Sequence, residues 1–455
     1  MAFKTYSRLI YATLESTEGT VTPVDFSNAD DFIEVIDPTF TFTNRVVERN
    51  PTRNSVTPAV QHVGGTGTTS GAISSQVEIS FTVEMAGSGT AATAPRWSRL
   101  LQACGMTEVT SLARVPLGNL TGATPAALLH KENISAQAGT AYASGTNIGR
   151  VIGDTHYDDG EVFLHKPGTP PATAASGNNV VGETSGVRGA ASGNQANSGV
   201  AWVLGSGLEL GSTDDTSLTI RFPFELTEAG TNNTGFIACG CRGNVEFAFV
   251  SGDRVLMNFT FIGKVDSYFN GVTLNPVAEG REIPPAFMGV NLAIGDSSYG
   301  NANAASFTDS VFSQMTLNLN NDLVLRDGAS YDGGFYATYI TGRNPSLTID
   351  VDSVEDTDYD FWDRFFSGET MHGKMTIGGT SGNKFLVKFP AAQISNLGDG
   401  NRDEVMVYDI NAALTGGDYG SSVRSDYDST DTTDGADIQM NPRNGTDNEF
   451  VLYHL

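Results

Sequence analysis

Residues 76–105 read QVEISFTVEMAGSGTAATAPRWSRLLQACG and combine two different hydrophobic periods. In the first part, apolar residues alternate with polar ones, at Val77, Ile79, Phe81 and Val83. This period of two predicts a strand with one buried face. In the second part, apolar residues follow a helical spacing, at Trp97, Leu100, Leu101 and Cys104. We therefore expect a short helix that begins near Thr93 and Pro95 and ends at Gly105.

A second block has the same strand–helix plan. Leu347, Ile349 and Val351 alternate with polar residues, and residues 358–367 (DYDFWDRFFS) predict a short helix that ends at Gly368. Acidic residues at the start of that helix complement its dipole. Further strand-like segments bracket each block. We therefore expect a mainly β protein of two tandem β-sandwich or barrel units, each with one short α-helix.

Changes in composition predict the domain boundaries. The first unit is expected to comprise residues 1–112 together with 216–278, and the second residues 286–415. Residues 113–215 are rich in Gly, Ala, Ser, Thr and Asn, which predicts a loop-rich insertion on the exterior. Residues 279–285 are expected to link the units. The Asp-rich residues 416–455 are expected to form an acidic C-terminal segment that folds back or packs on a neighbour.

The charge balance excludes several kinds of partner. The chain has 26 Lys and Arg against 52 Asp and Glu, a net charge of −26. A conventional nucleic-acid binder needs basic residues to displace counterions from phosphates, and an anionic membrane surface makes the same demand. No apolar run approaches the length of a membrane-spanning helix, and no signal peptide is recognised at the start. Three cysteines are too few for a disulfide framework, so we expect synthesis in a cytoplasm.

Two glycine-rich motifs suggest nucleotide binding, but their contexts argue against it. Gly87-x-Gly89-x-x-Ala92 lies between a predicted strand and a predicted helix, as a dinucleotide-binding turn does. The strand before it alternates, whereas a parallel strand of such a fold is a continuous apolar run. Gly368-x-x-x-x-Gly373-Lys374 is followed by Met375, where a phosphate-binding loop needs a hydroxyl. We interpret the first motif as a tight turn and the second as coincidence.

Other chemistry-bearing residues give no convergent site. The carboxylates between Asp426 and Asp437 lack the spacing of an EF-hand, which favours a solvated acidic loop over a calcium site. Cys239 and Cys241 have no second pair, which favours ordinary packing. The six histidines form no metal-binding spacing. His156 beside Asp158 is a pairing that any sequence this acidic offers. We therefore predict no catalytic residue, no metal and no cofactor.

Three segments closely resemble the tail tube proteins of tailed bacteriophages. They are residues 77–105, with the run Gly-Ser-Gly, Ala-Pro-x-Trp, Leu-Leu and Cys-Gly, residues 241–263 and residues 340–350. The resemblance covers roughly residues 30–112 and 216–414. It implies a β-sandwich that closes with its neighbours into a ring, and rings that stack into a hollow tube. It also implies a long loop that reaches towards the adjacent ring, which we place at 45–75.

The resemblance further implies a structural, non-enzymatic protein of a siphovirus-type virion tail, assembled in the host cytoplasm. Its partners would be other copies of itself, a tape-measure protein, and tail terminator and baseplate proteins, with no membrane partner. Rings of the family are commonly sixfold. Two units per chain predict a trimer with pseudo-sixfold symmetry, and one unit per chain a hexamer. Acidic residues in the lumen would let double-stranded DNA pass without specific binding.

Two other functions remain open from the sequence. A secreted or surface β-sandwich adhesin that binds glycans fits the Thr-, Asn- and Gly-rich composition, although no signal peptide is recognised. A glycan-degrading β enzyme is disfavoured because no site converges. Self-assembly would separate the tube protein from both alternatives.

Overall fold

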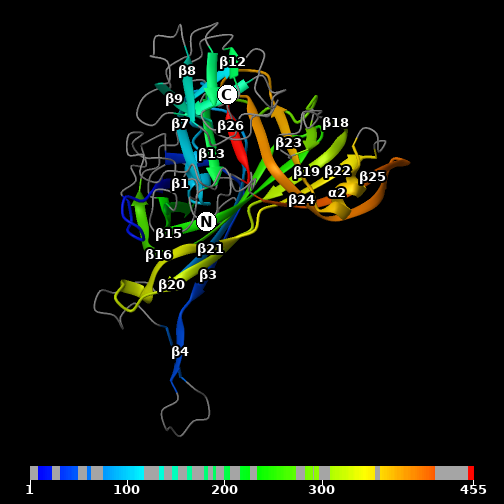
Figure 1. Cartoon of the computed structure of the whole chain (residues 1–455). Helices are drawn as coiled ribbons and strands as arrows, with labels where there is room; N and C mark the ends of the chain where they lie inside the picture. The colour runs from blue at the N-terminus through cyan, green and yellow to red at the C-terminus, as the bar shows by residue number, and fades with distance from the viewer. Residues whose placement is uncertain are drawn as a thin grey trace.

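The computed structural model describes the following residues: 9–22, 31–49, 59–62, 75–116, 133–137, 146–151, 161–165, 179–182, 188–190, 199–204, 216–225, 233–272, 282–290, 292–296, 308–353, 359–415 and 449–455. Strands dominate this part of the chain (Figure 1), and its α-helices are the short α1 (Ser98–Gln102) and α2 (Phe361–Ser367). The mainly β fold expected from the alternating segments is therefore confirmed.

The centre of the molecule is an antiparallel sheet of eight strands. In spatial order these are β3 (Ile36–Asn44), β6 (Ser75–Glu84), β16 (Leu256–Val272), β15 (Asn233–Val250), β19 (Phe312–Asn318), β22 (Ser346–Asp352), β25 (Val405–Leu414) and β24 (Phe385–Arg402). The pairing of β15 with β19 joins the strands of the two sequence blocks into one sheet. Residues from both blocks also share one hydrophobic core.

The two halves of this sheet have the same topology. In the first half, β2 (Phe32–Glu34), β1 (Leu9–Leu14) and β14 (Leu218–Glu225) continue from β15 as a second layer. In the second half, β18 (Thr308–Ser310), β17 (Leu292–Asp296) and β23 (Thr370–Ile377) continue from β24 in the same way. We call these halves the first and second repeats. The domain boundaries given above stay a prediction.

Each repeat carries a hairpin between corresponding strands. β4 (Val46–Arg49) and β5 (Ala59–His62) pair between β3 and β6, within the segment 45–75 in which a long loop was expected. β20 (Asn321–Asp327) and β21 (Phe335–Arg343) pair between β19 and β22, with a 3-10 turn at Asp332–Gly334. Figure 1 shows β4 projecting away from the body, whereas β20 and β21 lie along it.

The predicted insertion contributes strands to the fold. They are the end of β7 (Met106–Pro116), which begins in the predicted first unit, and β8 (Asn133–Gln137), β9 (Thr146–Val151), β10 (Glu161–His165), β11 (Asn179–Gly182), β12 (Arg188–Ala190) and β13 (Gly199–Leu204). Every residue of β13 is buried, unlike the exterior position expected for residues 113–215. The Trp202 indole lies 4.8 Å from that of Trp97 and donates a hydrogen bond to Ser98. This strand therefore supports α1.

The C-terminal residues fold back into the body, one of the two positions expected for them. β26 (Val451–His454) pairs with β13 on one side and with β24 on the other. Phe450, Val451, Leu452 and Tyr453 are completely buried. The Asp-rich residues between Asp426 and Asp437 lie outside the described residues. The last strand thus connects the insertion to the second repeat.

The two helices end as expected but differ at their starts. Gly105 and Gly368 both adopt positive φ, at 81° and 72°, which glycine tolerates. Asp360 caps α2, since its carboxylate accepts a hydrogen bond from the Asp363 amide at 2.8 Å. No side chain caps α1, which is shorter than predicted because Pro95 and Trp97 belong to the turn before it.

Candidate functional surfaces

The eight-stranded sheet has one apolar face and one polar face. The apolar face forms the core, with Val77, Ile79, Phe81, Phe259, Phe247, Leu317, Ile349 and Ile410 among its residues. The alternate positions of the same strands carry polar residues, including Glu78, Ser80, Thr82, Asn258, Thr260, Glu246, Thr316, Asn318, Thr348, Asp409 and Asn411. We call this second set the polar face. It crosses both repeats without interruption.

Side-chain hydrogen bonds run across the polar face from strand to strand. The Glu246 carboxylate accepts bonds from the amides of Asn258 and Asn318, at 3.2 and 3.1 Å. Thr82 donates to Asn258 at 2.8 Å, and in the second repeat Thr348 donates to Asn411 at 2.9 Å. These cross-strand pairs fix the side chains of the face and stabilise the sheet. The result is a hydrogen-bonded surface rich in Thr, Ser and Asn.

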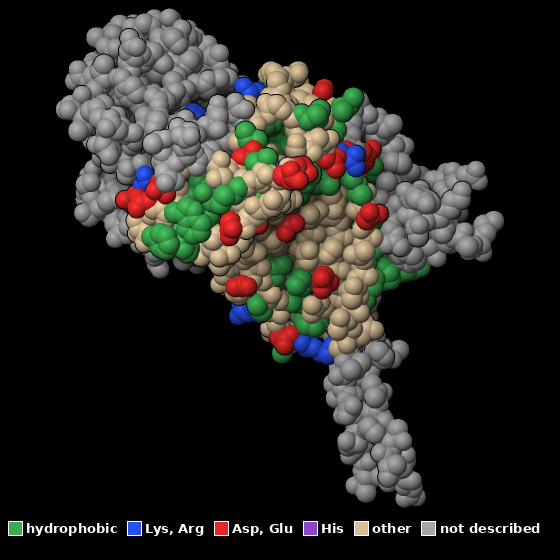
Figure 2. Space-filling view, turned by 90° about the vertical axis from the view of Figure 1, so that its right-hand side faces the viewer, with side chains coloured by type: hydrophobic (Ala, Val, Ile, Leu, Met, Phe, Trp, Pro, Cys, Tyr) green, Lys and Arg blue, Asp and Glu red, His purple; other side chains and the backbone are tan. Residues whose placement is uncertain are grey.

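Acidic groups outnumber basic ones on the surface seen from the side of α2 and β25. Figure 2 shows Asp and Glu side chains spread over the described part of this view, with few Lys or Arg between them. Some basic groups are neutralised locally: Arg402 pairs with Asp350 at 3.0 Å and also with Asp352, and Arg254 pairs with Glu84 at 2.7 Å. Such a surface repels polyanions instead of binding them.

The eight-stranded sheet ends in two edge strands. In the described ladders, β3 pairs only with β6, and residues 394–402 of β24 pair only with β25. Pro38 lies within β3, and proline is tolerated in sheets mainly on edge strands. Thr39, Thr41 and Thr43 are exposed on β3, and Ser395 and Asp399 on β24. A long edge of this kind is a template for pairing with another chain.

The Gly87–Gly89 motif joins the two repeats. The Gly89 amide donates to the Gly382 carbonyl at 3.0 Å, and the Gly87 amide donates to the Asn383 side chain at 2.9 Å. A Cβ atom on Gly87 would lie 2.0 Å from the Gly382 oxygen, so the close approach requires glycine there. The motif is a tight turn, as interpreted from the sequence, and its glycines allow contact between the backbones of the two repeats.

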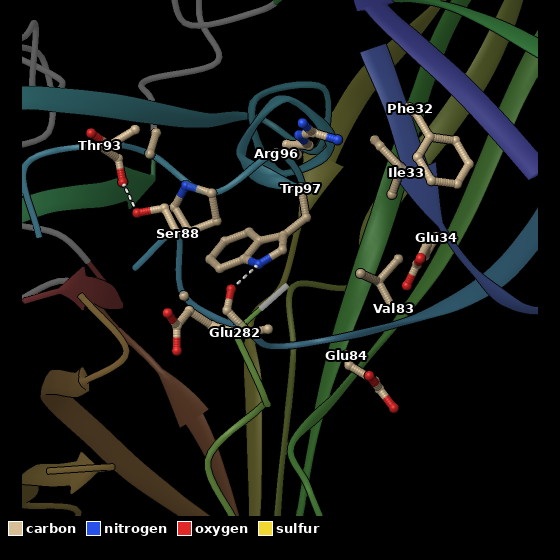
Figure 3. A pocket seen from close by; sticks show the side chains of 14 residues that line it. Phe32, Ile33, Glu34, Val83, Glu84, Ser88, Thr93, Arg96, Trp97 and Glu282 are labelled. Atoms are coloured by element: carbon tan, nitrogen blue, oxygen red, sulfur yellow. Dashed lines mark hydrogen bonds between the residues drawn. The ribbon is translucent and has the colours of Figure 1, made fainter. Parts of the chain in front are cut away.

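A pocket of about 260 Å³ lies beside this turn (Figure 3). Trp97, Ser88 and Thr93 line it from the strand–helix turn, and Glu84 and Glu282 from neighbouring segments. The Trp97 indole donates to the Ala86 carbonyl at 2.8 Å, and the Ser88 hydroxyl donates to the Thr93 carbonyl at 2.7 Å. These groups hold the turn in shape. They do not converge on a common point, so the pocket supports no reaction that we can write.

The remaining motifs have structural positions. Cys104, Cys239 and Cys241 are free and buried, and burial raises the pKa of Cys239 to about 12. Lys374 and Met375 belong to β23 rather than to a helix N-terminus. His156 and Asp158 lie outside the described residues. Within the described ranges, no three His, Cys, Asp or Glu side chains are grouped as metal ligands require, and no helix has the length and hydropathy needed to cross a membrane.

Comparison with known proteins adds no assignment. No protein-family model matches the sequence, and no curated protein matches it. The functional argument therefore rests on the polar face, its two edges and the internal repeat.

Proposed function

We propose that this chain is the tube subunit of a long, non-contractile bacteriophage tail. In this proposal it forms rings by strand pairing, and the rings stack into a hollow conduit for the genome. The observation that carries the proposal is the eight-stranded sheet, which has one buried face, one polar face and a pairing edge at each end. Such a sheet is incomplete alone and complete in a closed ring.

Strand direction supports closure by rotation about one axis. Successive strands of the sheet are antiparallel, and their number is even, so β3 and β24 run in opposite directions. Cyclic symmetry preserves strand direction along the axis. When β24 of one copy meets β3 of the next, the new pair is therefore antiparallel as well. The same operation repeats around the ring without a break in the pattern.

The internal repeat favours three chains in each ring. Each repeat supplies four strands in the same order, and β15 of the first repeat already pairs with β19 of the second. β24 and β3 are the corresponding strands at the two ends. Their pairing between copies would reproduce the junction within the chain. Three chains then supply six equivalent repeats, which gives the trimer with pseudo-sixfold symmetry.

The repeat also supplies a register for this junction. In the first repeat, Val83 pairs with Met257 and Met257 with Phe247, which defines one row across three strands. In the second repeat, the corresponding row runs from Val351 through Tyr408 to Asp399. Equating Val83 with Val351 makes Gly398 the counterpart of Glu246 and Thr41 the counterpart of Asn318. Because Glu246 lies opposite Asn318, we expect Gly398 of one copy to lie opposite Thr41 of the next.

The polar face would line the lumen in this arrangement. Its Glu and Asp side chains and the net charge of −26 would keep DNA away from the wall. Hydroxyl and amide groups that already bond one another offer no strong site for phosphates. Tape-measure, terminator and baseplate proteins would be further partners, and the virion tail the final location.

Electron microscopy of the purified protein over a concentration series tests the proposal. We expect hollow rings or tubes of uniform width. A protein that remains monomeric at every concentration and binds glycans in a screen would instead support the adhesin.

A cross-linking variant tests the register. Thr41→Cys with Gly398→Cys should form disulfides only between copies, and a Cβ on Gly398 has space because its nearest atom is 4.0 Å away. We expect cross-linked products up to the closed trimer. Each single variant serves as control because the natural cysteines are buried.

A further inference from the structure

The two hairpins of the repeats occupy corresponding places in the chain. Residues 45–74 connect β3 to β6, and residues 319–345 connect β19 to β22. Both segments contain one antiparallel hairpin. They differ in position, since β20–β21 packs on the first repeat and β4–β5 projects from the body (Figure 1).

The β20–β21 hairpin lies on a defined corner of the first repeat. This first-repeat corner consists of Cys104, Gly105, Gly240, Arg242, Gly243 and Ile262. The Asn321 amide donates to the carbonyls of Cys104 and Gly243, at 2.8 and 3.0 Å. A Cβ atom on Gly240 would lie 2.9 Å from the Cα of Ala337, and Gly240 has φ of 62°. The backbones of hairpin and corner are therefore in direct contact.

Ionic and aromatic contacts hold the hairpin on this corner. Arg242 is completely buried, donates to the Thr338 carbonyl and pairs with Glu18 at 2.7 Å. The Glu18 carboxylate also accepts hydrogen bonds from the hydroxyls of Tyr336 and Tyr339, at 3.2 and 3.1 Å. The buried Arg242 guanidinium thus has a carboxylate and a carbonyl as partners, and the tyrosines of the hairpin bond to the same carboxylate.

The far end of the β20–β21 hairpin reaches the base of the other hairpin. Asp327, the last residue of β20, pairs with Arg45, which follows β3. The Arg45 guanidinium also lies 4.3 Å from the ring centroid of Phe335. The hairpin of the second repeat thus crosses the first repeat from one side to the other.

The corresponding corner of the second repeat is partly exposed. Gly368 is the counterpart of Gly105, and Gln393 is the counterpart of Arg242, because each pairs with the same position of the following strand. Gln393 is exposed, and Phe366 beside the helix end is 76% exposed. Figure 2 views this side of the molecule and shows hydrophobic side chains at its surface. We call Phe366, Gly368, Gln393 and Ala413 the second-repeat corner.

We propose that the β4–β5 hairpin of the neighbouring copy in the same ring lies on the second-repeat corner. The inference rests on the proposed function, because it needs the β24–β3 junction between copies. That junction places the base of the neighbour's hairpin beside β24, as the β15–β19 junction places the base of β20–β21 beside β15. The hairpin then crosses the second repeat and ends near the base of β20–β21.

Charges at the two hairpins are complementary under this arrangement. Within the chain, Asp327 at the end of the crossing β20–β21 hairpin pairs with Arg45 at the base of β4–β5. In the register given above, Asp322 is the counterpart of Arg45. Arg49 is the last residue of β4, as Asp327 is the last residue of β20. At each of these two places the charges of the two hairpins have opposite signs. Asp322 is exposed, so Arg49 of the neighbouring copy would meet a carboxylate where Asp327 meets an arginine.

A charge-swap experiment on the full chain tests the proposal. Asp322→Arg alone and Arg49→Asp alone should each raise the concentration needed for ring formation about fivefold, and the double variant should restore it. Asp253→Arg is the control, since it makes the same charge change in an exposed turn at the opposite end of β19. Circular dichroism of the monomers checks that each variant is folded.

A cross-link between Cys residues at 49 and 322 distinguishes the neighbour. In isolated single rings, Arg49→Cys with Asp322→Cys should join chains of one ring. Cross-links that appear only in stacked tubes, or a double variant that assembles no better than the single ones, would overturn the proposal and leave the rings intact. Failure of the unaltered protein to form rings would instead contradict the proposed function on which the inference rests.

Discussion

The two repeats share one topology but solve the same packing problem differently. Both have a bulge in the first of their four sheet strands, which lies between Ile36 and Thr39 in β3 and between Phe312 and Met315 in β19. At the equivalent corner, however, the first repeat buries Arg242 and the second exposes Gln393. The covered corner belongs to the first repeat, which is followed in the sheet by the second repeat of the same chain, and the hairpin of that second repeat covers it. In the proposed assembly, the exposed corner and the β24 edge of the second repeat are the surfaces that contact the next copy.

Removing residues 449–455 should have the largest effect, because it cuts the strand that ties the insertion to the second repeat. Phe450, Leu452 and Tyr453 are completely buried, and each apolar side chain contributes about 1.5–3 kcal/mol. We expect a loss of more than about 4 kcal/mol in the free energy of unfolding, measured by urea titration. Unchanged stability would mean that β26 is dispensable to the core. Adding the seven-residue peptide should restore part of the loss.

Arg242→Gln gives the first repeat the residue of the second. Glu18 would then lie against the hairpin without its cationic partner, at 16% exposure. Loss of one member of a buried pair costs about 3–5 kcal/mol of unfolding free energy. Because solvent reaches Glu18, we expect a loss near the lower end of that range. Gln393→Arg, the reciprocal change on an exposed corner, should alter stability by less than about 0.5 kcal/mol. Equal effects in urea unfolding would contradict the difference between the corners.

Asp360→Ala tests the difference between the two helix starts. It removes the side-chain cap of α2, which α1 lacks, and should cost about 1 kcal/mol. Asp360→Asn, which keeps a cap acceptor, is the matched control. Thermal unfolding should place the Asn variant close to the original protein, and a lower transition for Asn than for Ala would exclude the capping role.

The smallest expected effect is a loss of stability at β26 when the pH is lowered. Burial lowers the pKa of His454, whose Nε2 lies 2.8 Å from the Gly382 carbonyl. The folded protein therefore favours the neutral ring, and this contribution is present above the unfolded pKa of about 6.5 and is lost as pH falls below it. The protection factors of the β26 amides, which are corrected for the slower intrinsic exchange at low pH, should be smaller at pH 5 than at pH 7.5. A His454→Gln variant should lose this pH dependence, and retention of it would assign the effect to another group.

The sequence predicts the elements that depend on local pattern. The alternation at Val77–Val83 corresponds to β6, the helix predicted over residues 358–367 corresponds to α2, and Gly105 and Gly368 follow the helix ends as expected. The burial of β13 was not predictable, because Val200–Val203 is a short apolar run whose partners are far away in the chain. The folding back of the C-terminal residues was one of two expected positions, but the pairing of Val451–His454 with β13 and β24 was not predicted. The corner at Arg242 was missed for the same reason, since Glu18 is distant in sequence.

The most direct test of the account is the symmetry of the assembled ring, measured by cryo-electron microscopy of the full chain. We predict three chains per ring, with a continuous sheet in which β24 of each copy pairs with β3 of the next and the polar face lines the lumen. Six chains per ring, or a ring in which β3 and β24 do not pair, would contradict it.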